Sequence, residues 1–178
     1  MSSHRFKDLL RFLRFDDRQR RDKSDRLAVI RFIFECFVKQ LPRHFIPSEN
    51  IIVGEQLVPF RVRCSFVQYM PKKQAKYGLK FWFLYDVESR YVLAFELYSG
   101  KIGNVIQRNL ATNVVLRLVD QLSNNIKQGR NITYDRYFSD LNLAKARLEH
   151  KMSSIGVVNH KHAFVPNELK IIRKQLYS

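Results

Sequence analysis

The sequence predicts a mixed α/β fold with the element order β-β-β-α-β-α-β, preceded by an α-helical segment. Apolar residues recur at helical spacing before residue 42, and from about residue 50 the chain changes to runs rich in β-branched and aromatic residues. A hydrophobic fraction of 46% over 178 residues suffices for one folded domain plus an appendage. We therefore expect one α/β unit that is entered through helices.

Two helices are expected before the first strand. In residues 4–15 the apolar positions Phe6, Leu9, Leu10 and Leu13 share one face, and basic residues fill the other. Residues 16–25 are almost entirely charged and are expected to form an exposed connector. The second helix should cover residues 27–41, with a cap at Ser24 or Asp25 and an end at Pro42.

Strands and helices alternate in the rest of the chain. Three strands are expected at residues 51–60, 79–85 and 91–98, the last two joined by a turn in which Asp86 is a turn residue. The elements expected after them are a helix at 110–122, a strand at 131–135, a helix at 139–151, a strand at 154–158 and a short basic helix at 168–176.

The charge of the chain favours a polyanionic partner. With 32 Lys and Arg against 16 Asp and Glu, the net charge is +16, and nucleic acid is the first partner to consider, ahead of a merely basic surface. Cys36 and Cys64 have no metal-site spacing and are expected to be reduced thiols of an intracellular protein. We expect no membrane insertion, because charges interrupt every apolar run.

Two stretches carry a specific motif. Residues 51–82 are IIVGEQLVPFRVRCSFVQYMPKKQAKYGLKFW, and residues 131–140 are NITYDRYFSD. They resemble the "DEQL.PFRGRC.F.QYMP.KP.KYGIK" and "RN.T.DN.FTS.PLA" blocks of piggyBac-type transposases.

The resemblance covers essentially the entire chain, but stops short of the family's insertion region, its later Asp residues and its Cys-rich C-terminal domain. It implies a partial ribonuclease-H-like core at residues 49–178. Residues 1–48 are similar to the end of the family's dimerisation and DNA-binding region.

The same resemblance implies that catalysis is lost. In the family the Asp of each block is a ligand of a DNA-cutting site that uses two magnesium ions. Here Gly54 stands at the first position and Asp135 at the second. Glycine offers no oxygen to a hard cation. Glu55 is expected to point to the opposite face of the strand, because side chains alternate along a strand.

No third carboxylate is expected either, since Glu149 and Glu168, the only acids after Asp140, lack the family's context. Asp135 would be a vestigial ligand that binds metal weakly if at all, and no cofactor is expected. Without the motif, Asp135 would be interpreted as a helix cap or as a partner of Arg136.

A basic block lies between residues 61 and 80 and is expected to contact DNA phosphates without sequence preference. Its basic members are Arg61, Arg63, Lys72, Lys73, Lys76 and Lys80. In the family this block contributes to the DNA-facing side. The interleaved Phe66, Tyr69 and Tyr77 are expected to fill the core rather than to stack on bases.

The sequence therefore predicts a nuclear, piggyBac-derived protein that is not an enzyme and keeps nonspecific DNA binding, with a homodimer left open. One alternative is an active metal-dependent nuclease or transposase with a rearranged site. Another is a module in which the helices of residues 4–41 bind a protein partner. A third is a pseudogene product with an incomplete sheet and an unpaired edge.

Overall fold

The computed structural model describes residues 1–100, 109–159 and 161–169. Its elements are α1 (Ser3–Phe12), α2 (Arg31–Gln40), a 3-10 turn (Leu41–Arg43), β1 (Asn50–Pro59), β2 (Gln68–Tyr69), β3 (Tyr77–Asp86), β4 (Val92–Leu97), α3 (Leu110–Asp120), α4 (Asn124–Lys127), β5 (Asn131–Tyr134), α5 (Leu141–Glu149), β6 (Ser153–Gly156) and a second 3-10 turn (Asn167–Leu169). The predicted order is confirmed, with β2 and α4 added. Both are too short to produce a periodic pattern. Most of the helix predicted at 168–176 lies outside the described residues.

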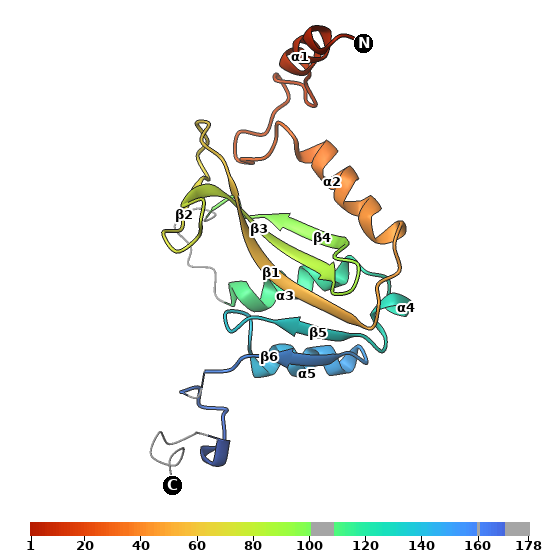
Figure 1. The fold of residues 1–178 in the computed structure, drawn as a ribbon, viewed down its shortest axis with the longest axis vertical. Helices are drawn as coiled ribbons and strands as arrows, with labels where there is room; N and C mark the ends of the chain where they lie inside the picture. The colour runs from red at the N-terminus through yellow and green to blue at the C-terminus, as the bar shows by residue number, and fades with distance from the viewer. Residues whose placement is uncertain (101–108, 160, 170–178) are drawn as a thin grey trace.

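The strands form one mixed sheet with β1 near its centre (Figure 1). On one side β1 pairs antiparallel with β3, and on the other side it pairs parallel with β5. The far edge of β3 is shared by β2 and β4, and β6 extends the sheet in parallel beyond β5. The predicted α/β fold is therefore confirmed. The structure adds that the antiparallel strands are followed by parallel ones.

One face of the sheet carries the hydrophobic core. Ile51 and Val53 of β1 and Leu84 of β3 are at most 1% exposed, and they pack with Val115 and Leu118 of α3. Figure 1 shows α3 behind these strands and α5 alongside β6. The alternation of buried and less buried residues along β1 explains why its sequence shows the period of a half-buried strand.

The opposite face of the sheet is only partly covered. Phe83 of β3 and Phe95 of β4 are register partners on this face, with ring centroids 5.6 Å apart. Phe34 of α2 packs edge-on against Phe95 at 5.2 Å, and Phe37 follows one turn later at 6.2 Å. The helix α2 thus covers the β4 side of the face and leaves the β1 side open.

The N-terminal helices differ slightly from the predicted ranges. Helix α1 ends at Phe12, and none of its residues is buried; it lies apart from the sheet in Figure 1. Helix α2 begins at Arg31 rather than at residue 27. Asp25 does act as a cap, but for the turn before the helix, where its carboxylate accepts from the backbone N–H of Leu27 at 2.9 Å.

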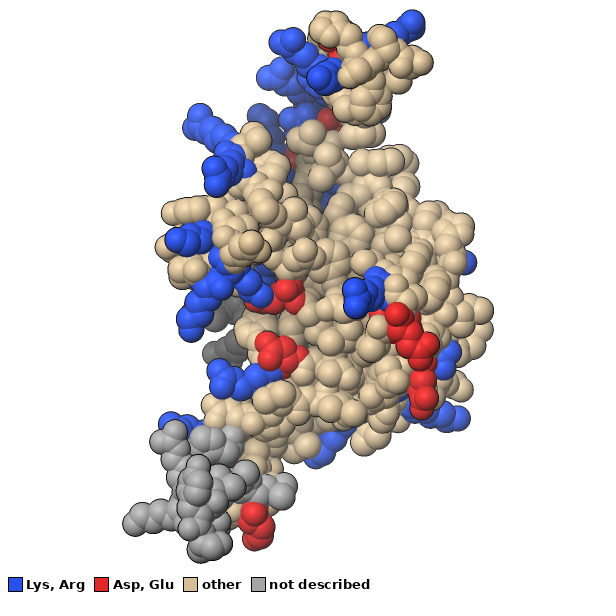
Figure 2. Space-filling view, viewed as in Figure 1, with Lys and Arg blue, Asp and Glu red and all other residues tan. Residues whose placement is uncertain are grey.

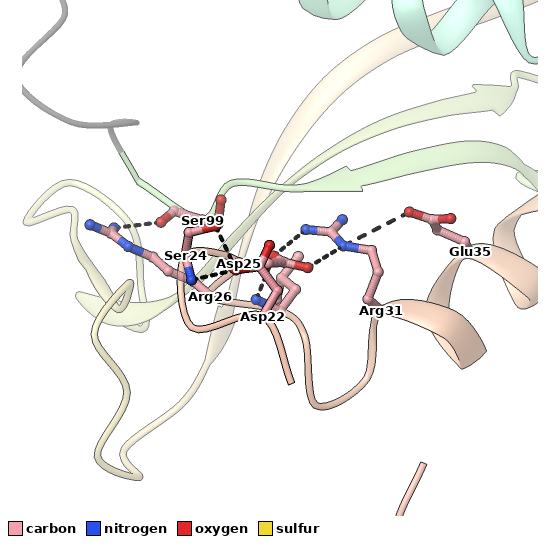
Figure 3. A network of polar contacts seen from close by, with 8 residues as sticks. Asp22, Ser24, Asp25, Arg26, Arg31, Glu35 and Ser99 are labelled. Carbon is pink, nitrogen blue, oxygen red and sulfur yellow. Dashed lines mark hydrogen bonds and ion pairs between the residues drawn. The ribbon is translucent and has the colours of Figure 1, made fainter. Parts of the chain in front are cut away.

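A polar network anchors the segment before α2 to the end of β4 (Figure 3). Arg26 donates to the carbonyl of Ser99 at 2.7 Å. Arg31 makes a two-pronged pair with Asp25, with distances of 2.6 and 2.8 Å. Gly100 has a φ of +91°, and a Cβ at this position would collide with the Arg26 guanidinium. The glycine therefore allows Arg26 to reach the main chain beside it.

Candidate functional site

The parallel pairing of β1 and β5 brings the two motif positions together. Val53 is the register partner of Tyr134, so Gly54 and Asp135 are the next residues along two adjacent strands. Both should lie on the sheet face opposite the core, because they follow residues that point into it. The two positions are 81 residues apart in the sequence (135 − 54), and the strand pairing brings them to one place.

At Gly54 the room for a side chain is tight. A Cβ on Gly54 would lie 3.1 Å from the phenol oxygen of Tyr85, closer than ordinary van der Waals contact. Tyr85 belongs to β3 and pairs with Ile52, so it reaches Gly54 diagonally across the strands. The two residues lie in an open groove of about 530 Å³. Its lining is Ile52, Gly54, Glu55, Gln56, Phe83, Tyr85, Val87, Arg90 and Val92.

Asp135 is exposed and is tied to its own turn. Its carboxylate accepts from the backbone N–H of Arg136 at 2.6 Å, and its carbonyl accepts from the N–H of Phe138 at 2.9 Å. It does not cap α5. That role belongs to Asp140, whose carboxylate accepts from the N–H groups of Asn142 and Leu143.

Glu55 lies on the core side of β1 and is engaged with two lysines. It is the register partner of the buried Trp82, whereas Gly54 pairs with Phe83. Its carboxylate is 2.7 Å from Nζ of Lys80 and 3.2 Å from Nζ of Lys73. Burial alone would raise the pKa of Glu55, but the hydrogen bonds and charges of the two lysines bring the pKa below its usual value. Glu55 thus lies on the face of β1 opposite to Gly54, as the strand period predicts.

Asp86 is a buried turn residue, in agreement with the sequence. Its carboxylate accepts from the N–H of Ser48 at 2.6 Å and from the N–H and hydroxyl of Ser89 at 2.8 and 2.6 Å. Burial would raise the pKa of Asp86, but these donors outweigh it and hold the pKa far below its ordinary value. The carboxylate therefore locks the β3–β4 turn onto the segment before β1.

The basic block divides into two groups. Arg61, Arg63, Lys72 and Lys76 are exposed, and Figure 2 shows Lys and Arg side chains gathered on the side where β2 lies. Lys73 and Lys80 instead pair with Glu55. Sequence reasoning missed these pairs, because their acid lies on β1, outside the block. The role of all six in DNA binding remains a prediction.

The aromatic residues of the block also divide. Phe66 is 9% exposed and fills the core as predicted. The same prediction is wrong for Tyr69 and Tyr77, which are 58% and 55% exposed. Their rings lie on paired positions of β2 and β3, with centroids 4.7 Å apart. The sheet ends at β2 on this side, which leaves more than half of each residue exposed.

Comparison with known proteins identifies the family. A family model described as Transposase IS4 matches residues 1–177. A solved structure, the cryo-EM structure of a piggyBac transposase synaptic complex with hairpin DNA, matches with a TM-score of 0.84 and 32% sequence identity. The chain belongs to the piggyBac-type transposase family. The match covers 98% of this chain and 37% of the other, so the chain spans a little over a third of that transposase.

The family assignment makes the sheet a ribonuclease-H-like transposase core. That Gly54 and Asp135 occupy the positions of the family's two metal ligands remains a prediction from the motif. Within the described ranges, no group of three or more His, Cys, Asp or Glu side chains could together hold a metal ion. In the same residues, no helix is both long and apolar enough to cross a membrane. Cys36 and Cys64 are both free thiols.

Proposed function

We propose that this chain is a piggyBac-derived transposase fragment that has lost DNA cleavage and retains nonspecific DNA binding. Residues 1–48 represent the end of the dimerisation and DNA-binding region, and residues 49–178 a partial catalytic core. The observation that carries the proposal is the environment of Gly54. The position has no ligand atom, and the Tyr85 phenol oxygen lies 3.1 Å from the point at which a side chain would begin.

The side chains present do not fit a pair of magnesium ions. Such ions need several oxygen ligands in near-octahedral geometry. Asp135 brings one carboxylate to the site, and that carboxylate already accepts from the backbone of Arg136. Glu55 is the nearest acid along β1, but it is held on the opposite face by Lys80. We therefore assign no cofactor and no cleavage chemistry to this chain.

Plasmid cleavage tests the loss of activity. Supercoiled plasmid is incubated with the full chain and with Asp135→Ala, in magnesium and in manganese. We expect the two proteins to leave the plasmid equally intact. Metal-dependent nicking by the wild-type chain that Asp135→Ala abolishes would overturn the proposal and would establish the alternative of an active enzyme with a rearranged site.

DNA binding is supported by charge and by position. The chain has a net charge of +16, and four basic residues of the block are exposed on the side where β2 lies. The similar solved structure is a transposase complex with hairpin DNA. Electrophoretic mobility shifts with unrelated duplexes, at about 50 and about 200 mM salt, should show affinity that falls steeply with salt and does not depend on sequence. Binding that ignores salt would contradict this proposal.

A protein-interaction module is the second proposal, and α1 favours it. All residues of this helix are exposed, including the apolar Phe6, Leu9 and Leu10 on one face. A partner helix or a second copy of the chain is the natural cover for such a face. If the chain is homodimeric through α1, Leu9→Glu will shift its mass in light scattering from dimer to monomer.

DNA binding implies a nuclear location, which fluorescence microscopy of a tagged chain would test.

A further inference from the structure

Tyr69 and Tyr77 form a pair of tyrosines that the fold does not require to be exposed. The two residues are cross-strand partners at the edge of the sheet, and their rings are tilted by 32° at a centroid distance of 4.7 Å. More than half of each residue remains exposed. Burial of an aromatic ring is a major source of folding free energy, and here most of that area is left in water.

The loop between the two tyrosines is closed by backbone hydrogen bonds. Residues 70–76 form a closed turn, in which the N–H of Met70 donates to the carbonyl of Lys76 at 2.7 Å and the N–H of Lys73 donates to the carbonyl of Met70 at 3.0 Å. Lys76 adopts a φ of +52°, which is unusual for a residue with a side chain. A constrained backbone of this kind fixes the direction of neighbouring side chains and is common at binding sites.

The surroundings of the pair are basic. Lys72 and Lys76 are exposed within the same turn, and Arg61 and Arg63 are exposed in the connection between β1 and β2. In this turn Lys73 forms an ion pair with Glu55 at 3.2 Å, whereas neither Lys72 nor Lys76 forms an ion pair within the described part of the chain. A pair of exposed rings beside free cations is the combination that binds single-stranded nucleic acid, since bases stack on rings while phosphates meet the cations.

From these observations we infer that Tyr69 and Tyr77 form a stacking site for an unpaired nucleobase. The inference rests on the proposed DNA binding and deepens it, because phosphate contacts alone would not distinguish paired from unpaired strands. The 4.7 Å between the ring centroids is too small to admit a base between them. The base therefore stacks on the exposed side of the pair, and Lys72 and Lys76 contact the flanking phosphates. A duplex whose bases are all paired offers no such face except at its ends.

The test measures the affinity of the full chain for three labelled DNAs of related sequence: a single strand, its blunt duplex, and a hairpin with an unpaired loop. Fluorescence anisotropy is recorded for the wild type, Tyr69→Ala, Tyr77→Ala and Tyr69→Phe. We expect either alanine variant to weaken binding to the single strand and the hairpin loop about tenfold, which corresponds to about 1.4 kcal/mol. Duplex binding should change by less than about twofold, because it depends on phosphate contacts. Tyr69→Phe keeps the ring and should bind as the wild type does.

Leu148→Ala is the matched control. Leu148 is an exposed apolar residue on α5, 65% accessible and outside both the basic block and residues 1–48, and its truncation should leave all three affinities unchanged. Thermal unfolding of each variant shows whether the fold is intact. A single-stranded RNA of the same sequence distinguishes the two sources of unpaired bases, and equal binding of RNA and DNA would assign the site to the base rather than to the sugar.

Two results would overturn the inference, and they differ in what they say about DNA binding. If the wild type binds duplex in a salt-dependent manner but the alanine variants lose single-strand and duplex affinity equally, or lose neither, there is no stacking site and the proposed DNA binding stands. If the wild type binds none of the nucleic acids, both are wrong.

Discussion

The phenol oxygen of Tyr85 lies 3.1 Å from the point that a Cβ on Gly54 would occupy. Two features therefore act against a ligand at position 54: the residue has no acid, and a ring from the neighbouring strand restricts the room for one. Restoring the acid alone would force the ring to move. This explains why reversal of the glycine is not expected to rebuild a metal site by itself.

A double-mutant cycle measures the conflict between these two residues. Gly54→Asp should lower the free energy of unfolding by about 1–3 kcal/mol, as overpacking substitutions do. In a Tyr85→Phe background the same substitution should cost about 1 kcal/mol less, because the oxygen that makes the closest contact is gone. Urea unfolding of the four proteins gives the coupling. An equal cost of Gly54→Asp in both backgrounds would show that Tyr85 does not restrict the position.

Asp86 should be a principal determinant of stability in the β3–β4 turn. Replacement by Asn removes the charge that three donors from Ser48 and Ser89 surround, and should lower the free energy of unfolding by about 1–3 kcal/mol. Glu88→Gln, an exposed change in the same turn, serves as the control and should be nearly neutral. Equal stability of the two variants in urea would contradict this role.

The contribution of Asp86 should also depend on pH. Its pKa is lower in the folded chain than in the unfolded chain, where Asp has a pKa of about 3.9. The stabilisation is therefore complete above the unfolded pKa and is lost as the pH falls through the folded pKa. Between about pH 5 and about pH 2.5, the melting temperature of the wild type should fall more than that of Asp86→Asn. If the difference in melting temperature between the wild type and Asp86→Asn stayed constant over this pH range, the depressed pKa of Asp86 would be contradicted.

The sequence was sufficient for features with a long or specific pattern. The alternation in residues 51–60 predicts a strand, and the two motif blocks predict that Gly54 and Asp135 come together, as the register of β1 and β5 shows. Asp86 was correctly interpreted as a turn residue because polar residues surround it. These features depend on local residues or on a motif that already encodes the distant contact.

Other features depend on contacts between strands that no local pattern encodes. The pairing of Lys80 with Glu55 follows from the register of β1 against β3. The contact of Tyr85 with Gly54 is diagonal across the same two strands. The exposure of Tyr69 follows from the position of β2 at the edge of the sheet, and two residues are too few to predict a strand.

Arg147 is a buried charge that the fold should tolerate losing. It is 2% exposed, and its Nε and Nη1 atoms have no hydrogen-bond partner among the described residues. Burial lowers the pKa of this guanidinium, against the opposing influence of Asp120. Arg147→Met should leave the free energy of unfolding unchanged or raise it by about 1–4 kcal/mol.

Lys145→Met is the control for this change, because Lys145 is exposed on the same helix. Chemical denaturation of both variants provides the comparison. A loss of more than about 2 kcal/mol specific to Arg147→Met would show that the guanidinium has favourable partners.

The exposed lysines of the basic block should contribute to DNA affinity, whereas the lysines paired with Glu55 should contribute to stability. Lys72→Gln should reduce the slope of log affinity for duplex against log salt by about 1 while leaving stability unchanged. Lys80→Gln should lower the free energy of unfolding by about 1–2 kcal/mol, because Glu55 loses its closer partner in a partly buried pair. Salt titrations and urea unfolding of both variants test this division. The division of the lysines into two groups would be contradicted if Lys72→Gln lowered the free energy of unfolding as much as Lys80→Gln does.

The central claim is that the piggyBac-type site can no longer bind its pair of catalytic ions. Crystals of the chain soaked in manganese and measured at the manganese absorption edge test it most directly. The account predicts no pair of anomalous peaks within coordination distance of the Asp135 carboxylate, in the wild type or in Gly54→Asp. Two neighbouring manganese peaks bound by Asp135 in the wild-type crystals would contradict it.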